Sequence, residues 1–146
     1  MTTYQREIVS AVMNEIKPML ADHQAEIATW QDIPLMPDYE TYLKADALGI
    51  VRLFTARRDK LIGYAVFFVG SLHYKTTLQA HGDLIFVIPE YRGKLVGNHL
   101  LDYSIARLKA EGMKLIRQPV MHTLDFGPLL VRKGFRPTET IYELRC

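Results

Sequence analysis

The sequence predicts a single domain of the α/β (α+β) class, with one mixed, mostly antiparallel sheet flanked by about four helices. Apolar residues recur at every third or fourth position over the first 30 residues and again after residue 95, as in amphipathic helices. The middle of the chain instead carries runs of β-branched and aromatic residues separated by a short charged turn, as in antiparallel strands. The 146 residues, 49% hydrophobic and 23% charged, correspond to one globular domain spanning residues 1–146.

Two helices joined by a loop are predicted in the N-terminal part. The first is expected to begin almost at once, with a capping box at Thr2, and Pro18 is expected to kink or divide it. The second is short, with Asp38 as its N-cap and Gly49 as the left-handed residue that ends it. The apolar face of the first helix is formed by Ile8, Val12, Ile16, Leu20, His23 and Ile27.

The remaining elements follow in order along the chain. A hairpin comes first, and Arg57–Lys60 between its strands is expected to be a solvated turn. A third strand ends at Pro89, and the helix that starts near Leu95 stops at Gly112. The predicted strands are Ile50–Ala56, Leu61–Val69, about Leu78–Ile88, Lys114–Val120 and Thr140–Arg145, with a short helix at Phe126–Lys133 before the last.

Composition argues against several classes of protein. Lys and Arg number 18 and Asp and Glu 16, and the resulting net charge of +2 is too small to indicate a nucleic-acid partner. The only cysteine is Cys146, so neither an internal disulfide nor a Cys-rich zinc site is expected. The first seven residues lack an apolar signal region, and the longest uncharged apolar stretch, Leu61–Gly70, is far shorter than the ~20 residues that span a bilayer. We expect a cytoplasmic protein without a membrane partner, and without a metal, since no ligand spacing links His23, His73 and His99.

One segment carries recognisable chemistry, Val87-Ile-Pro-Glu-Tyr-Arg-Gly-Lys-Leu-Val-Gly-Asn98. A strand that runs through a Gly-containing loop into a helix presents unpaired N–H groups and a positive dipole end, which together bind phosphate. Arg92 and Lys94 add positive charge, while Gly93 and Gly97 permit close approach or positive φ. The spacing fits neither a Walker A loop nor the Rossmann fingerprint. A strand–turn–helix in which glycine serves only the turn remains the alternative.

This segment resembles a known family. Pro89–Gly97 is similar to the acetyl-CoA loop of the GNAT family of N-acetyltransferases, whose signature is Arg/Gln-x-x-Gly-x-Gly/Ala, with Arg92 at the first position and Gly97 at the last. Downstream, Leu129–Phe135 resembles the family's second cofactor segment, and the order of elements fits from about residue 5 to the end. The resemblance implies that acetyl-CoA is bound by Phe86, Val87, Ile88, Arg92, Gly93, Lys94, Leu95, Val96, Gly97 and Asn98.

The resemblance also implies transfer of an acetyl group to a primary amine of a small molecule or a protein. The amine must lose a proton before it attacks, and Asp83 stands where many members carry a glutamate. His81 lies two residues earlier on the same strand face and is the other candidate base. Asp83 as a cap or ion-pair partner and His81 as an ordinary strand-end histidine are the structural alternatives. A backbone N–H near Val87 would polarise the acetyl carbonyl, as in the family.

Two residues depart from the family pattern. Leu95 occupies the middle glycine of the signature, and Leu130 stands where a tyrosine often protonates the departing CoA thiolate. His122, just after the predicted strand Lys114–Val120, is our candidate for a substitute acid. Protonation by solvent, with His122 satisfied by backbone, is the alternative. The family's first strand is hard to find, since the predicted helix begins so early.

The acceptor and partners remain open at this point. The aromatic and apolar set Trp30, Met36, Tyr39 and Tyr42 either walls the acceptor pocket or packs helix on sheet. The chain also resembles small GNAT members of bacteriophages and prophages, which share the Pro-Leu-x-Pro-Asp loop at Pro34–Asp38. A GNAT-fold binding protein that engages a host protein with little turnover is therefore the rival hypothesis. Both a monomer and a homodimer are compatible with the sequence.

Overall fold

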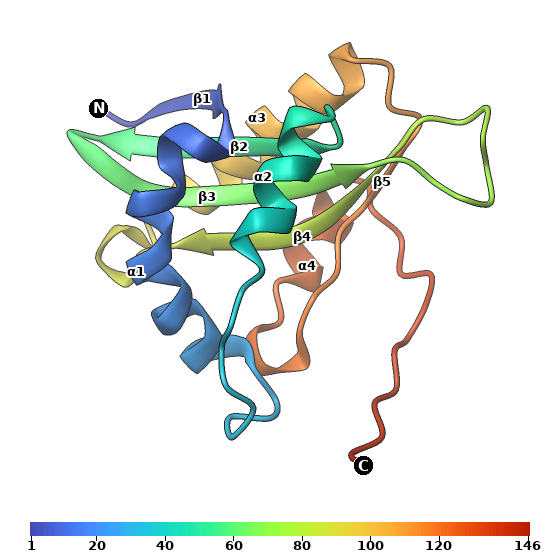
Figure 1. Ribbon diagram of the computed structural model, residues 1–146. Helices are drawn as coiled ribbons and strands as arrows, with labels where there is room; N and C mark the ends of the chain where they lie inside the picture. Colours follow the sequence, from blue (N-terminus) through green and yellow to red (C-terminus); the bar gives the residue numbers. More distant parts are fainter.

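Five strands form one sheet at the centre of the computed structural model, which describes residues 1–146, and helices cover both of its faces (Figure 1). The strands are β1 (Thr3–Glu7), β2 (Val51–Arg58), β3 (Lys60–Val69), β4 (Gln79–Val87) and β5 (Leu115–Arg117). The helices are α1 (Val9–Ile27), α2 (Tyr39–Ala47), α3 (Val96–Ala110) and α4 (Gly127–Arg132), with 3₁₀ turns η1 (Pro89–Tyr91) and η2 (His122–Leu124). None of the helices combines the length and the apolarity needed to cross a bilayer.

The sheet topology confirms the predicted fold class. The strands lie in the order β1-β2-β3-β4-β5; the first four are antiparallel, and β5 alone runs parallel to its neighbour β4. Such a parallel pair needs a crossover connection, and α3 supplies it. The sheet is therefore mixed and mostly antiparallel.

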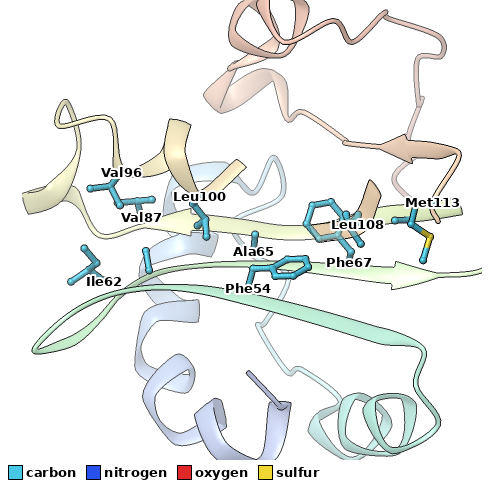
Figure 2. Packing of buried hydrophobic residues seen from close by; sticks show 11 residues of the cluster. Phe54, Ile62, Ala65, Phe67, Val87, Val96, Leu100, Leu108 and Met113 are labelled. Carbon is cyan, nitrogen blue, oxygen red and sulfur yellow. The ribbon is translucent and has the colours of Figure 1, made fainter. Parts of the chain in front are cut away.

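Each face of the sheet has its own apolar core. On one face, Phe54, Phe67 and other side chains of β2–β4 pack against α3, as Figure 2 shows. On the other face, α1 and α2 cover a second cluster that is centred on Leu53, Leu61 and the fully buried Tyr64. The central strands β2 and β3 are largely buried, and burial on both faces explains the nearly continuous apolar sequence Leu61–Val69 of β3.

Most predicted elements are confirmed within a few residues. The side chain of Asp38 accepts a hydrogen bond from the Thr41 N–H (3.0 Å) and caps α2, and Gly49 ends that helix at a φ of 76°. Gly112 follows α3 at a φ of 92°, as expected of a left-handed C-terminal residue. Pro18 stands inside α1, which nevertheless runs as one helix from Val9 to Ile27.

The N-terminal prediction is wrong in its first residues. Thr3–Glu7 is a strand that pairs with β2, and the first helix begins only at Val9, with Ile8 as an N-cap that lends no side chain. The capping box at Thr2 therefore does not form. Pairing with an open sheet edge, a contact made some 50 residues away in sequence, decides the conformation of these residues in place of local propensity.

The hairpin also differs from the prediction of a solvated turn at Arg57–Lys60. Arg57 belongs to β2, and its guanidinium bridges Glu7 of β1 (2.8 Å) and Glu15 of α1 (2.7 Å). The hydrogen bonds from Arg57 hold the pKa of the Glu15 carboxyl below its usual range. Only Asp59, with a φ of 50°, is left to reverse the chain.

The C-terminal strand predicted at Thr140–Arg145 does not form, and β5 is shorter than predicted. The segment after α4 is extended without strand pairing and descends away from the sheet (Figure 1). Its polar side chains instead contact the α1–α2 loop, where Trp30 Nε1 donates to Glu143 (3.0 Å) and Arg145 pairs with Asp32 (2.5 Å).

Candidate functional site

The loop before α3 presents a run of free backbone donors. From Gly93 to Asn98, six consecutive N–H groups donate no hydrogen bond within the chain, and the first amide of the region to find a partner is that of His99, bonded to the Leu95 carbonyl (2.9 Å). Any helix leaves about four such donors at its start, and the dipole makes that end positive. Gly93 and Leu95 are both left-handed, with φ of 73° and 62°, a conformation that turns successive amides toward one concavity. This is a geometry for binding phosphate oxygens.

Arg92 makes contacts within the protein that the motif does not predict. Its Nε donates to the Val87 carbonyl (2.8 Å), and its guanidinium pairs with Glu26 of α1 (2.7 Å) and lies over the Phe86 ring. Arg92 therefore ties the loop to the end of β4 and to α1, with its charge largely matched by Glu26. Lys94 is exposed, and its ammonium lies 5.7 Å from the centre of the Tyr91 ring.

Gly97 lies where α3 passes close to β4. A Cβ at this position would face the Val87 side chain at 3.7 Å, an ordinary contact, and would not project toward the free amides. The glycine thus lets helix and strand approach, and alanine fits there. At Gly93 a Cβ would meet open space, so the requirement for glycine comes from its positive φ.

One edge of β4 is open along most of its length. β5 pairs only with Gln79–His81, so from Gly82 onward β4 has a neighbour on the β3 side alone. The Ile88 N–H donates to the Ile62 carbonyl of β3 (2.9 Å), and because strand residues alternate, the Val87 N–H faces the open edge. This donor stands beside the loop and has no strand partner on its side.

Asp83 occupies an irregularity in β4. The register shifts between the pairs Val66–Leu84 and Phe67–Gly82, leaving Asp83 as an extra residue in the ladder. Its carboxylate accepts a short hydrogen bond from the hydroxyl of Tyr42 on α2. Partial burial raises the pKa of Asp83 above its usual range, although the Tyr42 hydrogen bond opposes the rise.

His81 lies one step farther along the same region. It pairs across the ladder with Phe68, whose ring packs against the Tyr42 ring with centroids 5.7 Å apart. Directly paired residues share a face of the sheet, so His81 lies on the face that Tyr42 covers. The two candidate bases thus lie near each other, and the hydrogen bond to Tyr42 distinguishes Asp83.

His122 and Leu130 lie beyond β5, on η2 and α4 respectively. His122 is exposed on η2, which packs beside the end of α1, where the Thr123 hydroxyl donates to the Ile27 carbonyl (2.5 Å). Leu130 is buried on α4 with only 5% of its surface exposed. The structure thus places His122 in solvent and gives Leu130 a packing role.

An apolar pocket of about 460 Å³ lies between α1, α2, the loop joining them and the sheet. Met36, Tyr39 and Tyr42 line it, and Tyr39 and Tyr42 also pack against the core beneath, whereas Trp30 lines a smaller cavity of about 220 Å³ beside Glu143. Sequence reasoning missed Met13, Ile16 and Leu84 as lining residues. Their apolar character indicated only core positions, and no signal in the sequence distinguished the wall of a cavity from the core.

Replacing Leu95 with glycine is expected to leave the free protein at least as stable. The left-handed conformation costs a residue with a Cβ roughly 1 kcal/mol, and this approximately offsets the entropy that glycine loses on folding. Leu95→Ile should lower the melting temperature, since a β-branched residue tolerates this φ poorly. Thermal melts of the two variants measure both effects; a marked loss of stability in Leu95→Gly would contradict this account.

Residues 15–124, more than half of the chain, match the model of the acetyltransferase (GNAT) family. With the mixed sheet and the free-amide loop after β4, this match shows that the chain belongs to that family of acetyl-transferring enzymes. No group of three or more His, Cys, Asp and Glu side chains in the structure is arranged to hold a metal ion.

Solved structures share the fold at low sequence identity. A predicted acetyltransferase of Clostridium acetobutylicum, solved with acetyl-CoA, is 16% identical with a TM-score of 0.71, covering 99% of this chain and 96% of that one. An aminoglycoside acetyltransferase from an uncultured soil metagenomic sample, in complex with sisomicin, is 15% identical with a TM-score of 0.72 and coverage of 99% and 97%. The ribosomal-protein-alanine N-acetyltransferase of Brucella melitensis biovar Abortus 2308 is 16% identical with a TM-score of 0.68 and coverage of 100% and 99%. No curated protein matches the chain.

Proposed function

We propose that this protein transfers an acetyl group from acetyl-CoA to a primary amine. The observation that carries the proposal is the run of six unpaired amides at Gly93–Asn98. Such a run suits the pyrophosphate of coenzyme A, and it is longer than the about four free donors that a helix start leaves by itself. Its position after β4, beside the open strand edge, is what the family membership leads one to expect.

The residues that would hold the substrate have separate tasks. The amides of Gly93–Asn98 bind the pyrophosphate, and Arg92 keeps the loop in shape through Val87 and Glu26. The Val87 N–H is directed at the carbonyl oxygen of the acyl group and stabilises negative charge there. Acetyl-CoA supplies the activated thioester when it is bound.

Asp83 is the base that we assign to the acceptor amine. An amine in water is protonated at neutral pH and must lose a proton before it attacks. A carboxylate with a raised pKa accepts that proton better than an ordinary aspartate. About four residues of strand separate Asp83 from Val87, a span of roughly 13 Å before the irregularity shortens it, so the transfer runs through water. Tyr42 positions the carboxylate. His81 is retained as the alternative base.

His122 is proposed as the acid that protonates the departing thiolate, and its alanine variant tests this role. The side chain is exposed, so His122→Ala should leave the melting temperature and acetyl-CoA affinity unchanged. Turnover should fall at least tenfold at a pH where solvent is a poor donor. If the variant turns over at the parent rate from pH 6 to 9, solvent is the donor. Leu130→Tyr is a poor complement, because it adds volume at a buried position.

The rival hypothesis of a GNAT-fold protein that only binds a host protein rested on Leu95 and Leu130. Leu95 adopts the left-handed conformation that its position requires, which removes one of the two objections to catalysis. The deciding experiment measures CoA release with a panel of amines, together with thermal melts in acetyl-CoA. Acetyl-CoA at a hundred times its dissociation constant should stabilise the protein by about 2.7 kcal/mol. An unshifted melting temperature with no CoA release would overturn the enzymatic proposal and favour the binding protein, including one of phage origin.

A further inference from the structure

The 460 Å³ pocket is apolar on nearly every side. Twelve of its 16 lining residues are hydrophobic, supplied by α1, the α1–α2 loop, α2 and the strands beneath. Met13, Ile16 and Leu20 of α1 form one wall, and Leu53 and Val66 form the floor on the sheet. A cavity of this size accepts a drug-sized molecule, and such sites bind chiefly through the apolar area that they bury.

The charges around the pocket do not suit a polycationic acceptor. Asp38 is the only ionisable carboxylate in the lining, and both of its oxygens are engaged by Thr41, one by the N–H (3.0 Å) and one by the hydroxyl (2.6 Å). The nearby Lys17 ammonium lies over the Tyr39 ring, 4.5 Å from its centre. A polyamine or an aminoglycoside would therefore leave most of its ammonium groups unpaired against hydrocarbon.

The polar end of the pocket is at Tyr42. Its ring lines the cavity, and its hydroxyl reaches out to Asp83, which is open to solvent at the rim of β4. A molecule whose apolar body fills the cavity therefore directs its amine out at the rim, where its proton can pass to Asp83 through water. A protein lysine would arrive amine first with its backbone outside, and the cavity would stay empty.

The loop that walls the cavity is held in place. Gln24 Nε2 donates to the Ile33 carbonyl (3.0 Å), and the C-terminal segment secures the same loop through Arg145 and Asp32. Because this wall is already ordered, less conformational entropy of the loop is lost when a ligand binds.

We infer that the acceptor is a small primary amine with an apolar arylalkyl body, which the pocket between α1 and α2 binds. This rests on the proposed acetyl transfer to an amine. The test is the series benzylamine, 2-phenylethylamine, 3-phenylpropylamine and 4-phenylbutylamine, with CoA release as the readout. Because each buried methylene contributes about 0.8 kcal/mol, kcat/KM should rise about fourfold per methylene. 4-Phenylbutanol, which has the body without the amine, should inhibit competitively against the amine.

A pair of variants separates the pocket from general effects. Leu35→Ser/Met36→Ser makes the loop wall polar at two exposed positions, and should reduce the gain to less than twofold per methylene while the melting shift in acetyl-CoA stays at the parent value. Leu72→Ser, at a still more exposed position outside the pocket, is the control for loss of a surface apolar side chain and should behave as the parent.

Each other outcome overturns the inference. Equal rates across the series, or faster turnover of spermidine, would refute the apolar acceptor and leave acetyl transfer intact. Faster turnover of a peptide with an N-terminal phenylalanine would refute the small-molecule class. If no amine is acetylated, the proposed function fails as well, and the melting shift in acetyl-CoA then shows whether cofactor binding survives.

Discussion

Asn98→Asp is expected to weaken acetyl-CoA binding about 10- to 100-fold while the free protein melts at the same or a higher temperature. Asn98 lies in the first turn of α3, among the six free amides. A carboxylate there interacts favourably with the helix dipole, which stabilises the folded state by roughly 0.3–1 kcal/mol. The same charge repels a diphosphate a few ångströms away by a few kcal/mol at an effective dielectric constant of about 20. Stability and affinity should thus move in opposite directions.

Calorimetric titration at low and high salt, with thermal melts, measures both quantities. Lys109→Gln changes the net charge by the same amount at the far end of α3 and is the matched control. It should bind acetyl-CoA like the parent. Because exposed charges are screened, the deficit of Asn98→Asp should shrink as salt rises. Equal affinity of Asn98→Asp and the parent at low salt would remove the helix start from the binding site.

The cofactor loop was predictable from sequence because its structure is local. Strand, turn and helix signals follow one another within twelve residues, and glycine at position 93 marks a positive φ that no distant contact is needed to explain. Leu95 is the exception. Its left-handed conformation is imposed by the turn on either side and carries no signature of its own.

The errors in the fold arise where distant segments decide the conformation. β1 exists because β2 offers an edge, and Arg57 is drawn inward by Glu7 and Glu15, carboxylates more than 40 residues away in sequence. The tail at Thr140–Arg145 has strand-like residues but finds no partner strand, and its charged side chains pair with the α1–α2 loop. Periodicity reports what a segment prefers and gives no information about what lies beside it.

In the candidate site, too, local features were predictable from the sequence and contacts between distant segments were not. Asp83 was predictable as a candidate base, but its hydrogen bond to Tyr42 was not, since 41 residues separate the two. Only part of the pocket lining was predictable, because the apolar spacing of α1 is the same for a core face and for a cavity wall. The motif predicted that Arg92 contacts the ligand. It did not predict the hydrogen bonds that Arg92 donates to the Val87 carbonyl and to Glu26.

Asp83→Asn is expected to lower turnover about 10²- to 10⁴-fold without loss of stability at neutral pH. The pKa of Asp83 is raised in the fold, chiefly by burial, so its protonated form is the one that the fold favours. The stability that this group contributes is therefore present below the unfolded pKa of about 3.9 and is lost as pH rises through the folded pKa. At pH 7 the ionised carboxylate costs stability. Asparagine removes that cost and still accepts the Tyr42 hydrogen bond, so the melting temperature should stay the same or rise.

The pH profile distinguishes a base from a structural aspartate. In the parent, kcat/KM should fall on the acid side as Asp83 takes up a proton, at a pH above the usual ~3.9 of an aspartate. Tyr42→Phe keeps the ring but removes a hydrogen bond that lowers this pKa, so the acid limb should move to higher pH while acetyl-CoA binding is unchanged. His81→Ala is the parallel variant on the same strand face. If the limb disappears in His81→Ala and persists in Asp83→Asn, His81 is the base and the pairing of Asp83 with Tyr42 serves only to fasten α2 to the irregularity in β4.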